Sequence, residues 1–308
     1  DFFTQDGARW IEIRCDALRH EPRYAFVRAA SYNDKMAKLL ELVRTLPHPM
    51  IVYVASPADA EAAAQHLCTH GIANVRTFTG LTTGVQRKKL IDAWTADEFP
   101  IMVATSAFGV GVDKSDVRTV LHLYLPQNAN AYYQELGRGG RDGLPCLSVM
   151  LCVLPDDLSA AFGRISKKVM TTEKILGRWN SMYHSPLSLR KKQLCYMDTS
   201  VRPNYAETDS MEDVPPSEAD VNWNVYVLLF LRRYHLIRIH EVLPQGAKYI
   251  FVIEVLEAAL RTPDEEQRAV VERCRAAEWD YYVSSYQSMR AAIKNCGTVC
   301  WSEMFYEI

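Results

Sequence analysis

The sequence predicts an α/β fold: an open parallel sheet with helices on both faces, followed by a smaller α+β region. Between about residues 31 and 155, short continuous apolar runs alternate with amphipathic stretches whose apolar residues recur at helical spacing. The runs are rich in β-branched residues, as expected of parallel strands that are buried on both faces. After Pro155 the alternation ends, and a basic stretch, an apolar helix and a hairpin pattern follow.

The elements of the first region follow one another in the order helix, strand, helix. A helix from about Asn33 to Val43 precedes the first apolar run, MIVYVA at 50–55. Further strands are predicted at 75–78, 100–105, 117–125 and 147–154, with helices between them at 58–70, 86–94 and 130–136. Strict alternation of this kind indicates a single open parallel sheet.

The second region begins with a basic stretch. Nine basic and two acidic residues lie between Arg164 and Arg202. Such a stretch is either a surface for a nucleic-acid backbone or an ordinary solvated face, and the sequence leaves both interpretations open. Residues 203–220 are polar and contain two consecutive prolines, which indicates a linker.

The remainder of the second region combines helices with a hairpin. Residues 223–237 are almost wholly apolar and predict a helix. The segments RIHEVL and KYIFVIEVL, joined by PQGA, predict a β-hairpin after it. This order suits a winged helix, although many small α/β units share it. A long helix that ends at about Asn295 is expected next.

The composition excludes several classes of protein. The chain has 308 residues with 35 basic and 37 acidic side chains, which excludes a histone-like polycation but not a local basic groove. Its longest wholly apolar run, at 225–231, is far shorter than the ~20 residues that a membrane-spanning helix needs. No secretory signal is visible, and the eight cysteines include no CxxC pair. We therefore expect a cytoplasmic protein with reduced thiols and no membrane contact.

The first stretch with candidate chemistry is ATSAFGVGVDKSD at 104–116. A predicted strand ends at Thr105, and a loop with Gly109 and Gly111 leads to Asp113. The carboxyl ends of parallel strands border the ligand crevice of such sheets. Glycines let the backbone approach a nucleotide, and a nearby carboxylate accepts hydrogen bonds from a ribose. The alternative is a tight turn without a ligand.

The second stretch is YYQELGRGGRDG at 132–143. Gln134, Arg138 and Arg141 lie four and then three residues apart, which would place them on one face of a helix. Glycines at 137, 139 and 140 make a helix as far as Arg141 doubtful, but they leave room for a phosphate beside the guanidinium groups. The alternative is a solvated, charged helix end with a glycine cap.

Together these stretches resemble motifs V and VI of superfamily 2 helicases, most closely those of the RecQ family. The family's motif V is similar to residues 104–118 and its motif VI to residues 132–143. Upstream, IVYVAS at 51–56 resembles the motif IV strand, and FTGL at 78–81 with the later Arg87 resembles motif IVa. A RecQ-like helicase of the DpdF type, from a bacterial DNA-modification or defence system, is a similar protein within this group.

The resemblance implies a RecA-like second motor domain at 31–160, preceded at 1–30 by a lead-in from a first motor domain. A basic helical segment with a linker is expected at 161–220. A winged-helix-like hairpin module with a long C-terminal helix is expected at 221–308. Cys300 and the residues after it resemble the helix that opens the family's zinc module, so a zinc ligand there stays an open question.

The resemblance also implies roles in catalysis. Arg141 is the expected arginine finger, and Arg138 is expected to reach the γ-phosphate. Gln134 is expected to position that phosphate or the water that attacks it. The nucleotide is expected to lie along Gly109, Gly111 and Asp113, with the Asp113 carboxylate at the ribose hydroxyls.

Nucleic-acid contacts are implied for four further residues, which are Ser56, Gly80, Arg87 and Thr105. Hydroxyl groups and backbone N–H groups are expected to meet the phosphates of the strand. Two departures from the family pattern, Pro57 after Ser56 and a longer loop before Arg87, put the contacts of motifs IV and IVa in doubt.

The chain contains no GxxxxGK[ST] sequence, so ATP and Mg²⁺ are expected to need the first motor domain, and the chain alone is expected to be inactive. We interpret it as the C-terminal part of an ATP-dependent DNA helicase. Hydrolysis between two RecA-like domains would drive translocation and unwinding of DNA with a single-stranded region, 3′-to-5′ by family resemblance. The alternative is a non-catalytic nucleic-acid-binding or scaffolding module derived from a helicase domain.

Overall fold

The computed structural model describes residues 17–109, 112–191, 193–203, 217–246, 248–298 and 300–306. The chain divides into two compact units. The first ends at Ile165 and resumes at Ser284, and the second comprises Ser166–Val283.

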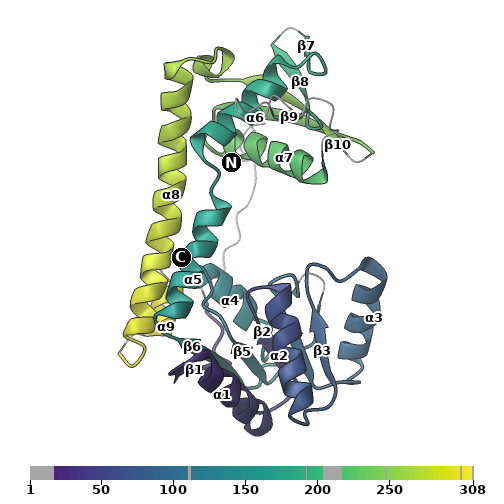
Figure 1. Ribbon diagram of the computed structural model, residues 1–308, viewed down its shortest axis with the longest axis vertical. Coiled ribbons are helices and arrows are strands. Elements are labelled where there is room, and N and C mark those ends of the chain that lie inside the picture. The colour runs from purple at the N-terminus through teal and green to yellow at the C-terminus, as the bar shows by residue number, and fades with distance from the viewer. Residues whose placement is uncertain are drawn as a thin grey trace. The chain divides into compact units, whose positions relative to one another are not determined.

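The first unit is built on a six-stranded parallel sheet in the order β1-β6-β5-β2-β4-β3 (Figure 1). The strands are β1 (Pro22–Ala29), β2 (Met50–Tyr53), β3 (Val75–Phe78), β4 (Ile101–Ala104), β5 (Thr119–His122) and β6 (Cys146–Val153). The helices that alternate with them are α1 (Tyr32–Thr45), α2 (Pro57–Thr69), α3 (Gly84–Thr95), α4 (Ala129–Leu136) and α5 (Asp156–Lys168). The predicted fold class, an open parallel sheet of the RecA-like type, is confirmed.

Helices cover both faces of this sheet, and the central strand β2 shows it. Met50 and Val52 are buried in one core together with apolar residues of α1 and α2. Ile51 and Tyr53 are buried in a second core that contains Trp94 of α3. Successive residues of a strand point to opposite faces, so a strand covered on both sides needs apolar side chains at every position.

Strand β1 lies inside the segment that the sequence analysis assigned to a lead-in. It pairs in parallel with β6, from Pro22 opposite Cys146 to Ala29 opposite Val153. Pro22 is compatible with this position because the first residue of an edge strand can lack an N–H donor. The part of the expected lead-in at 1–16 lies outside the described residues.

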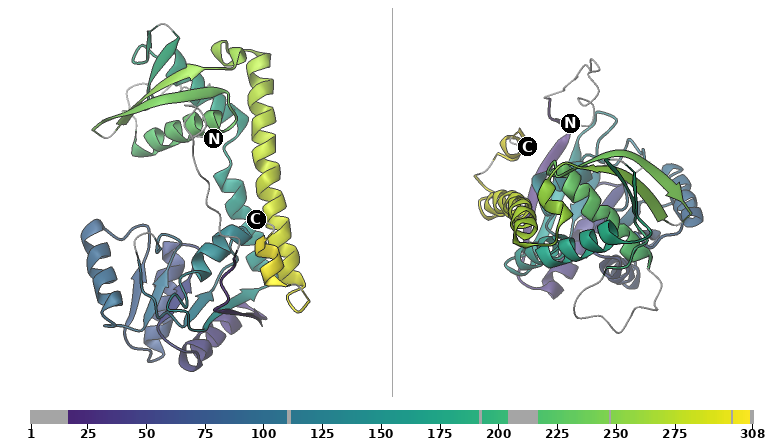
Figure 2. Two further views of the ribbon diagram at one scale, coloured as in Figure 1. Left: turned by 180° about the vertical axis from the view of Figure 1, so that it is seen from behind. Right: turned by 90° about the horizontal axis from the view of Figure 1, so that it is seen from above.

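The second unit contains a four-stranded antiparallel sheet in the order β7-β8-β10-β9, against which helices α6 and α7 pack (Figure 2). Its elements are α6 (Thr172–His184), β7 (Leu189–Lys191), β8 (Leu194–Asp198), α7 (Glu218–Arg233), β9 (Ile237–Gln245), β10 (Lys248–Val255) and a short 3₁₀ helix (Ala258–Arg261). The expected helix followed by a hairpin is present as α7, β9 and β10.

The basic segment expected to be helical contains a hairpin of its own, β7 and β8. Cys195 and Met197 of β8 are buried and lie opposite Ile253 and Phe251 of β10. The alternation of these two apolar side chains with partly exposed neighbours is the pattern of a half-buried strand. Most of the expected linker, residues 204–216, lies outside the described part of the chain.

The long helix α8 (Glu265–Lys294) is shared between the two units at Val283. Its last residues and α9 (Trp301–Tyr306) belong to the first unit. There the Tyr286 hydroxyl donates a hydrogen bond to the Leu158 carbonyl at 2.9 Å, and the Phe305 ring packs on Tyr133 of α4. The expected 221–308 module therefore differs from the compact units, because its last residues pack on the parallel sheet.

Candidate nucleotide-binding edge of the parallel sheet

The candidate site lies where three neighbouring strands of the sheet end. Strands β2, β4 and β3 are adjacent and parallel, so the loops that follow them meet at one edge. Two backbone hydrogen bonds tie the loops together, from Val54 N–H to the Ala104 carbonyl (2.9 Å) and from Thr105 N–H to the Phe78 carbonyl (3.1 Å). This edge carries Ser56 after β2, Gly80 after β3, and Thr105 and Gly109 after β4.

Gly109 and Arg138 are in direct contact at this edge. A Cβ atom at Gly109 would lie 2.6 Å from the Arg138 Nη2 atom, so the guanidinium rests on the bare glycine backbone. The loop beneath is held by the Tyr53 hydroxyl, which donates to the Phe108 carbonyl at 3.0 Å. Burial raises the pKa of this tyrosine, and the positive charge of Arg138 partly offsets the effect. Gly111, the second glycine of the predicted nucleotide loop, lies outside the described residues.

The Arg138 side chain has an unsatisfied donor. Its Nε–H is buried and has no hydrogen-bond partner among the described residues. A buried donor without an acceptor costs roughly 1–3 kcal/mol, and more when the group is charged. Such a donor can be satisfied by an ordered water, an ion, a ligand or another chain.

Arg141 forms an ion pair with Asp113, a contact that the sequence analysis did not predict. Its Nη1 atom donates to the Asp113 Oδ1 atom at 2.8 Å, and its Nε atom donates to the Gly137 carbonyl at 3.2 Å. The Asp113 side chain is 85% exposed, so the ion pair faces water. Exposed pairs of this kind contribute about 0–1 kcal/mol, which a phosphate can readily outcompete.

Both arginines lie in a loop and not on a helix. Helix α4 ends at Leu136, and residues 137–143 form turns in which Gly140 has a φ of +60°. The doubt that the glycines raised about a longer helix is therefore confirmed. Gln134 is exposed on the last turn of α4, and its side chain makes no hydrogen bond to the described residues.

A buried carboxylate that sequence reasoning missed fixes α4 to the sheet. Glu135 is 6% exposed and accepts a hydrogen bond from the Tyr124 hydroxyl at 2.6 Å. Its other oxygen lies 3.0 Å from His122 Nε2. Burial, with the negative charge of Glu135, raises the pKa of Tyr124. An acidic residue inside the predicted helix next to Gln134 was the available signal, because only a partnered carboxylate is stable in a core.

Two of the predicted nucleic-acid contacts are occupied by the protein itself. The Ser56 hydroxyl caps α2: it accepts from Asp59 N–H at 3.2 Å and donates to the Asp59 carboxylate at 2.7 Å. Arg87 donates to the carbonyls of Thr82 (2.9 Å) and Gly80 (3.4 Å), and its guanidinium lies 5.3 Å from the centre of the Phe78 ring.

The other two differ in access. Gly80 is exposed, and a Cβ atom there would meet nothing within 4 Å, so its backbone is open to a phosphate. Thr105 is 7% exposed.

Residues 34–143 match the helicase conserved C-terminal domain family. The chain is 33% identical over 178 residues to the probable ATP-dependent DNA helicase RecS of Bacillus subtilis, a match over 56% of this chain and 36% of the relative. It is 44% identical over 101 residues to the ATP-dependent DNA helicase RecQ of the same organism, over 33% of this chain and 17% of the relative.

Residues 34–143 are a RecQ-like helicase C-terminal domain. The chain spans only 17% to 36% of the length of these two relatives. Among solved structures, the C-terminal domain of the DEAD-box protein Dbp5 is similar over 48% of this chain and 87% of its own, with 21% identity and a TM-score of 0.41.

The last feature of the described residues concerns side chains that could hold a metal ion. Within the described ranges, no group of three or more histidine, cysteine or acidic side chains is arranged to hold a metal ion. Cys296 is half-buried and Cys300 is exposed, and both are free thiols. Among the described residues, no helix is long and apolar enough to cross a membrane.

Proposed function

We propose that this chain supplies the second motor domain of an ATP-dependent DNA helicase. ATP would lie between this domain and a first RecA-like domain of the same protein. The observation that carries the proposal is the pair Arg138 and Arg141, which converge on Gly109 and Asp113 at the carboxyl ends of the strands. One guanidinium has an unsatisfied buried donor, and the other has only an exposed partner.

These residues can act on a triphosphate in a definite way. On closure of the two domains, Arg141 leaves Asp113 and donates to the γ-phosphate, where negative charge develops during hydrolysis. Arg138 donates to the same phosphate from its position over Gly109. The Asp113 carboxylate becomes free to accept from the ribose hydroxyls. Gln134, exposed one helical turn before Arg138, orients the phosphate or the attacking water.

DNA is the proposed partner at the same edge of the sheet. Gly80 offers its open backbone N–H to a strand phosphate, and Thr105 lies on the neighbouring loop. Ser56 and Arg87 hold the shapes of the loops that present these groups. Opening of the domains after hydrolysis would shift the grip on the strand and give translocation and unwinding. The 3′-to-5′ direction, a cytoplasmic location and a closer relation to the DpdF type stay predictions from the sequence.

The complete protein with R141A tests the proposal. An arginine finger contributes about 10³–10⁵ in rate, so we expect the kcat of DNA-stimulated ATP hydrolysis to fall by about 10³-fold. The matched control is R44A, because Arg44 lies on α1 and, among the described residues, its side chain donates to the His70 carbonyl alone. Unchanged turnover in R141A would remove the proposed function and would favour the non-catalytic module.

A further inference from the structure

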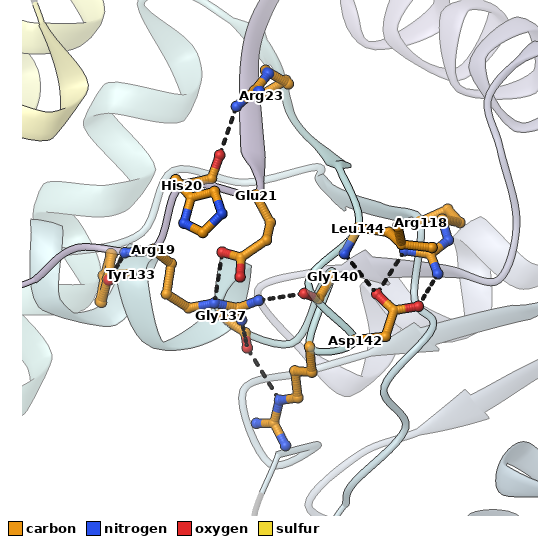
Figure 3. A network of polar contacts seen from close by, with 11 residues as sticks. Arg19, His20, Glu21, Arg23, Arg118, Tyr133, Gly137, Gly140, Asp142 and Leu144 are labelled. Carbon is orange, nitrogen blue, oxygen red and sulfur yellow. Dashed lines mark hydrogen bonds and ion pairs between the residues drawn. The ribbon is translucent and has the colours of Figure 1, made fainter.

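The segment before β1 binds the loop that carries the two arginines. Arg19 donates from Nη1 to the Gly137 carbonyl at 2.8 Å and from Nη2 to the Gly140 carbonyl at 2.6 Å (Figure 3). Its backbone N–H donates to the Tyr133 hydroxyl at 3.1 Å. The Arg19 side chain thus connects both ends of the turn at 137–140, called the glycine turn below. The Arg19 backbone connects to α4.

The Gly137 carbonyl is shared between two guanidinium groups. It accepts from Arg19 at 2.8 Å and from the Arg141 Nε atom at 3.2 Å. The position of this oxygen therefore bears directly on the position of Arg141. Glu21, whose carboxylate lies 3.3 Å from Arg19 Nε, balances the second positive charge.

Arg19 itself is not placed to hold a ligand. Its three nitrogen groups are all directed at protein acceptors, namely Glu21, Gly137 and Gly140. The planar fork of a guanidinium can hold two carbonyls at a fixed separation, which an ammonium group does poorly. Arg19 differs in this from Arg138, whose Nε–H has no partner among the described residues.

The glycine turn has other anchors, so the fold does not depend on Arg19 alone. Gly140 N–H donates to the Val117 carbonyl at 2.9 Å. Asp142 forms an ion pair with Arg118 (Figure 3). Both anchors act at or after Gly140. Arg19 holds the Gly137 carbonyl, at the start of the turn, at a fixed separation from the Gly140 carbonyl at its end.

We propose that Arg19 is a positioning residue for the arginine finger: by holding the Gly137 and Gly140 carbonyls, it sets the Arg141 guanidinium for the phosphate. The inference rests on the proposed function, because it needs Arg141 to act on ATP. It assigns a task to the segment that enters β1, which the resemblance to the helicase motifs does not reach.

Backbone hydrogen exchange in the complete protein tests the positioning directly, without any turnover. In R19A, the amides of residues 137–143 should exchange faster than in the wild type, because the turn has lost the contact between its ends. The matched control is R23A, because Arg23 lies in the same segment and its side chain donates to the His20 carbonyl and to no other described residue (Figure 3). Equal exchange of these amides in R19A, R23A and wild type would overturn the proposal.

Kinetics of the same variants test the link to Arg141. A displacement of about 1 Å in a catalytic group can cost up to about 10²-fold in rate, so R19A should lower kcat by about ten- to a hundredfold with little change in the KM for ATP. R19K, which keeps the charge but not the fork, should recover part of this loss. The double variant R19A/R141A should be no slower than R141A, because Arg19 acts through Arg141.

The outcomes separate the two proposals. If R141A loses activity and R19A keeps it, the role of Arg19 is wrong and the proposed function stands. If R141A keeps full activity, the proposed function itself fails. An R19A loss that adds fully to that of R141A would show that Arg19 acts independently, and would also overturn the inference. Should R19A fail to fold, R19K is measured in its place by both exchange and kinetics, with the same expected directions.

Discussion

Arg87 and Arg138 lie at the same edge of one sheet, and the fold uses them differently. Arg87 donates to two carbonyls of its own loop and lies over the Phe78 ring. Arg138 rests on Gly109, and its buried Nε–H has no acceptor among the described residues. Both were candidates for phosphate contacts on the basis of motif resemblance. Their hydrogen bonds show that Arg87 stabilises a loop, whereas Arg138 has a donor without an acceptor among the described residues.

The difference gives a criterion for assigning arginines in such domains. A guanidinium whose donors are satisfied by backbone carbonyls would have to break those bonds to bind a phosphate. A guanidinium with an unsatisfied donor gains a bond on binding, which offsets its cost of burial. Variants at Arg138, Gly109 and Arg87 test this criterion, and a buried acid of the second unit gives a separate test of burial.

The largest expected effect is that of R138A on catalysis. Removing one preorganised donor from a developing negative charge costs about 10²–10³ in rate. We expect kcat for DNA-stimulated ATP hydrolysis by the complete protein to fall by about 10²-fold, while the free energy of unfolding stays unchanged or rises. Wild-type turnover of R138A would show that Arg138, like Arg87, does not act on the phosphate.

The next effect is that of G109A on the same turnover. A Cβ atom would lie 2.6 Å from Arg138 Nη2, and this flexible end of the side chain would have to move away from the backbone. We expect kcat to fall by about tenfold with a normal thermal unfolding midpoint. G84A is the matched control, because a Cβ at Gly84 meets nothing within 4 Å. Equal turnover of the two variants would contradict the assigned contact.

A smaller effect, on stability and not on catalysis, is expected for R87A. The loss of two charge-assisted hydrogen bonds and a cation–π contact should lower the free energy of unfolding by about 1–2 kcal/mol. The slope of log affinity for single-stranded DNA against log salt should change by much less than the ~0.7 expected for one lost phosphate contact. Chemical denaturation and binding titrations check this. If R87A lowered the salt slope by one whole phosphate contact and left the free energy of unfolding unchanged, Arg87 would be a DNA contact and not a loop anchor.

The smallest effect concerns a buried acid in the second unit. Glu278 on α8 is 3% exposed and accepts from the Tyr226 hydroxyl at 3.1 Å. Burial raises its pKa above the usual value, so the folded state binds its proton more tightly than the unfolded state. The contribution of Glu278 to stability is therefore fully present at low pH and is lost as pH rises through the raised pKa.

Unfolding free energies of wild type and E278Q between pH 4 and 7 check this prediction. The difference between wild type and variant should move against the wild type as pH rises. Y226F should steepen the trend, because the tyrosine hydrogen bond lowers the pKa of Glu278. If the difference in unfolding free energy did not vary with pH, the pKa of Glu278 would be the same in the folded and unfolded states, which would contradict the prediction.

Much of the parallel sheet could be predicted from the sequence, because β2 and β4 are apolar at every position. The strands β2 and β4 are fully buried and appear as uninterrupted apolar runs. The edge strand β1 is buried only in part, and Arg23 and Arg28 flank its short apolar run at 24–27. The hairpin of β7 and β8 was missed because β8 is fixed by β10, about fifty residues later, which local periodicity does not reveal.

The candidate site divides in the same way. The two motifs predicted the residues of the site, because these residues are close in sequence to the ends of strands, but not the contacts of Arg141 with Asp113 and of Arg138 with Gly109. Arg19 was missed because its acceptors, the carbonyls of Gly137 and Gly140, are backbone atoms more than a hundred residues away. Glu135 was missed because its burial depends on how α4 packs on β5.

The most direct test of the central claim is binding of a transition-state analogue, ADP with aluminium fluoride and Mg²⁺, to the complete protein. A group that acts only in the transition state contributes to binding of the analogue and not to binding of ADP. We predict that R141A binds the analogue at least about 10²-fold more weakly than the wild type and binds ADP almost equally well. Equal affinity of wild type and R141A for the analogue would contradict the account.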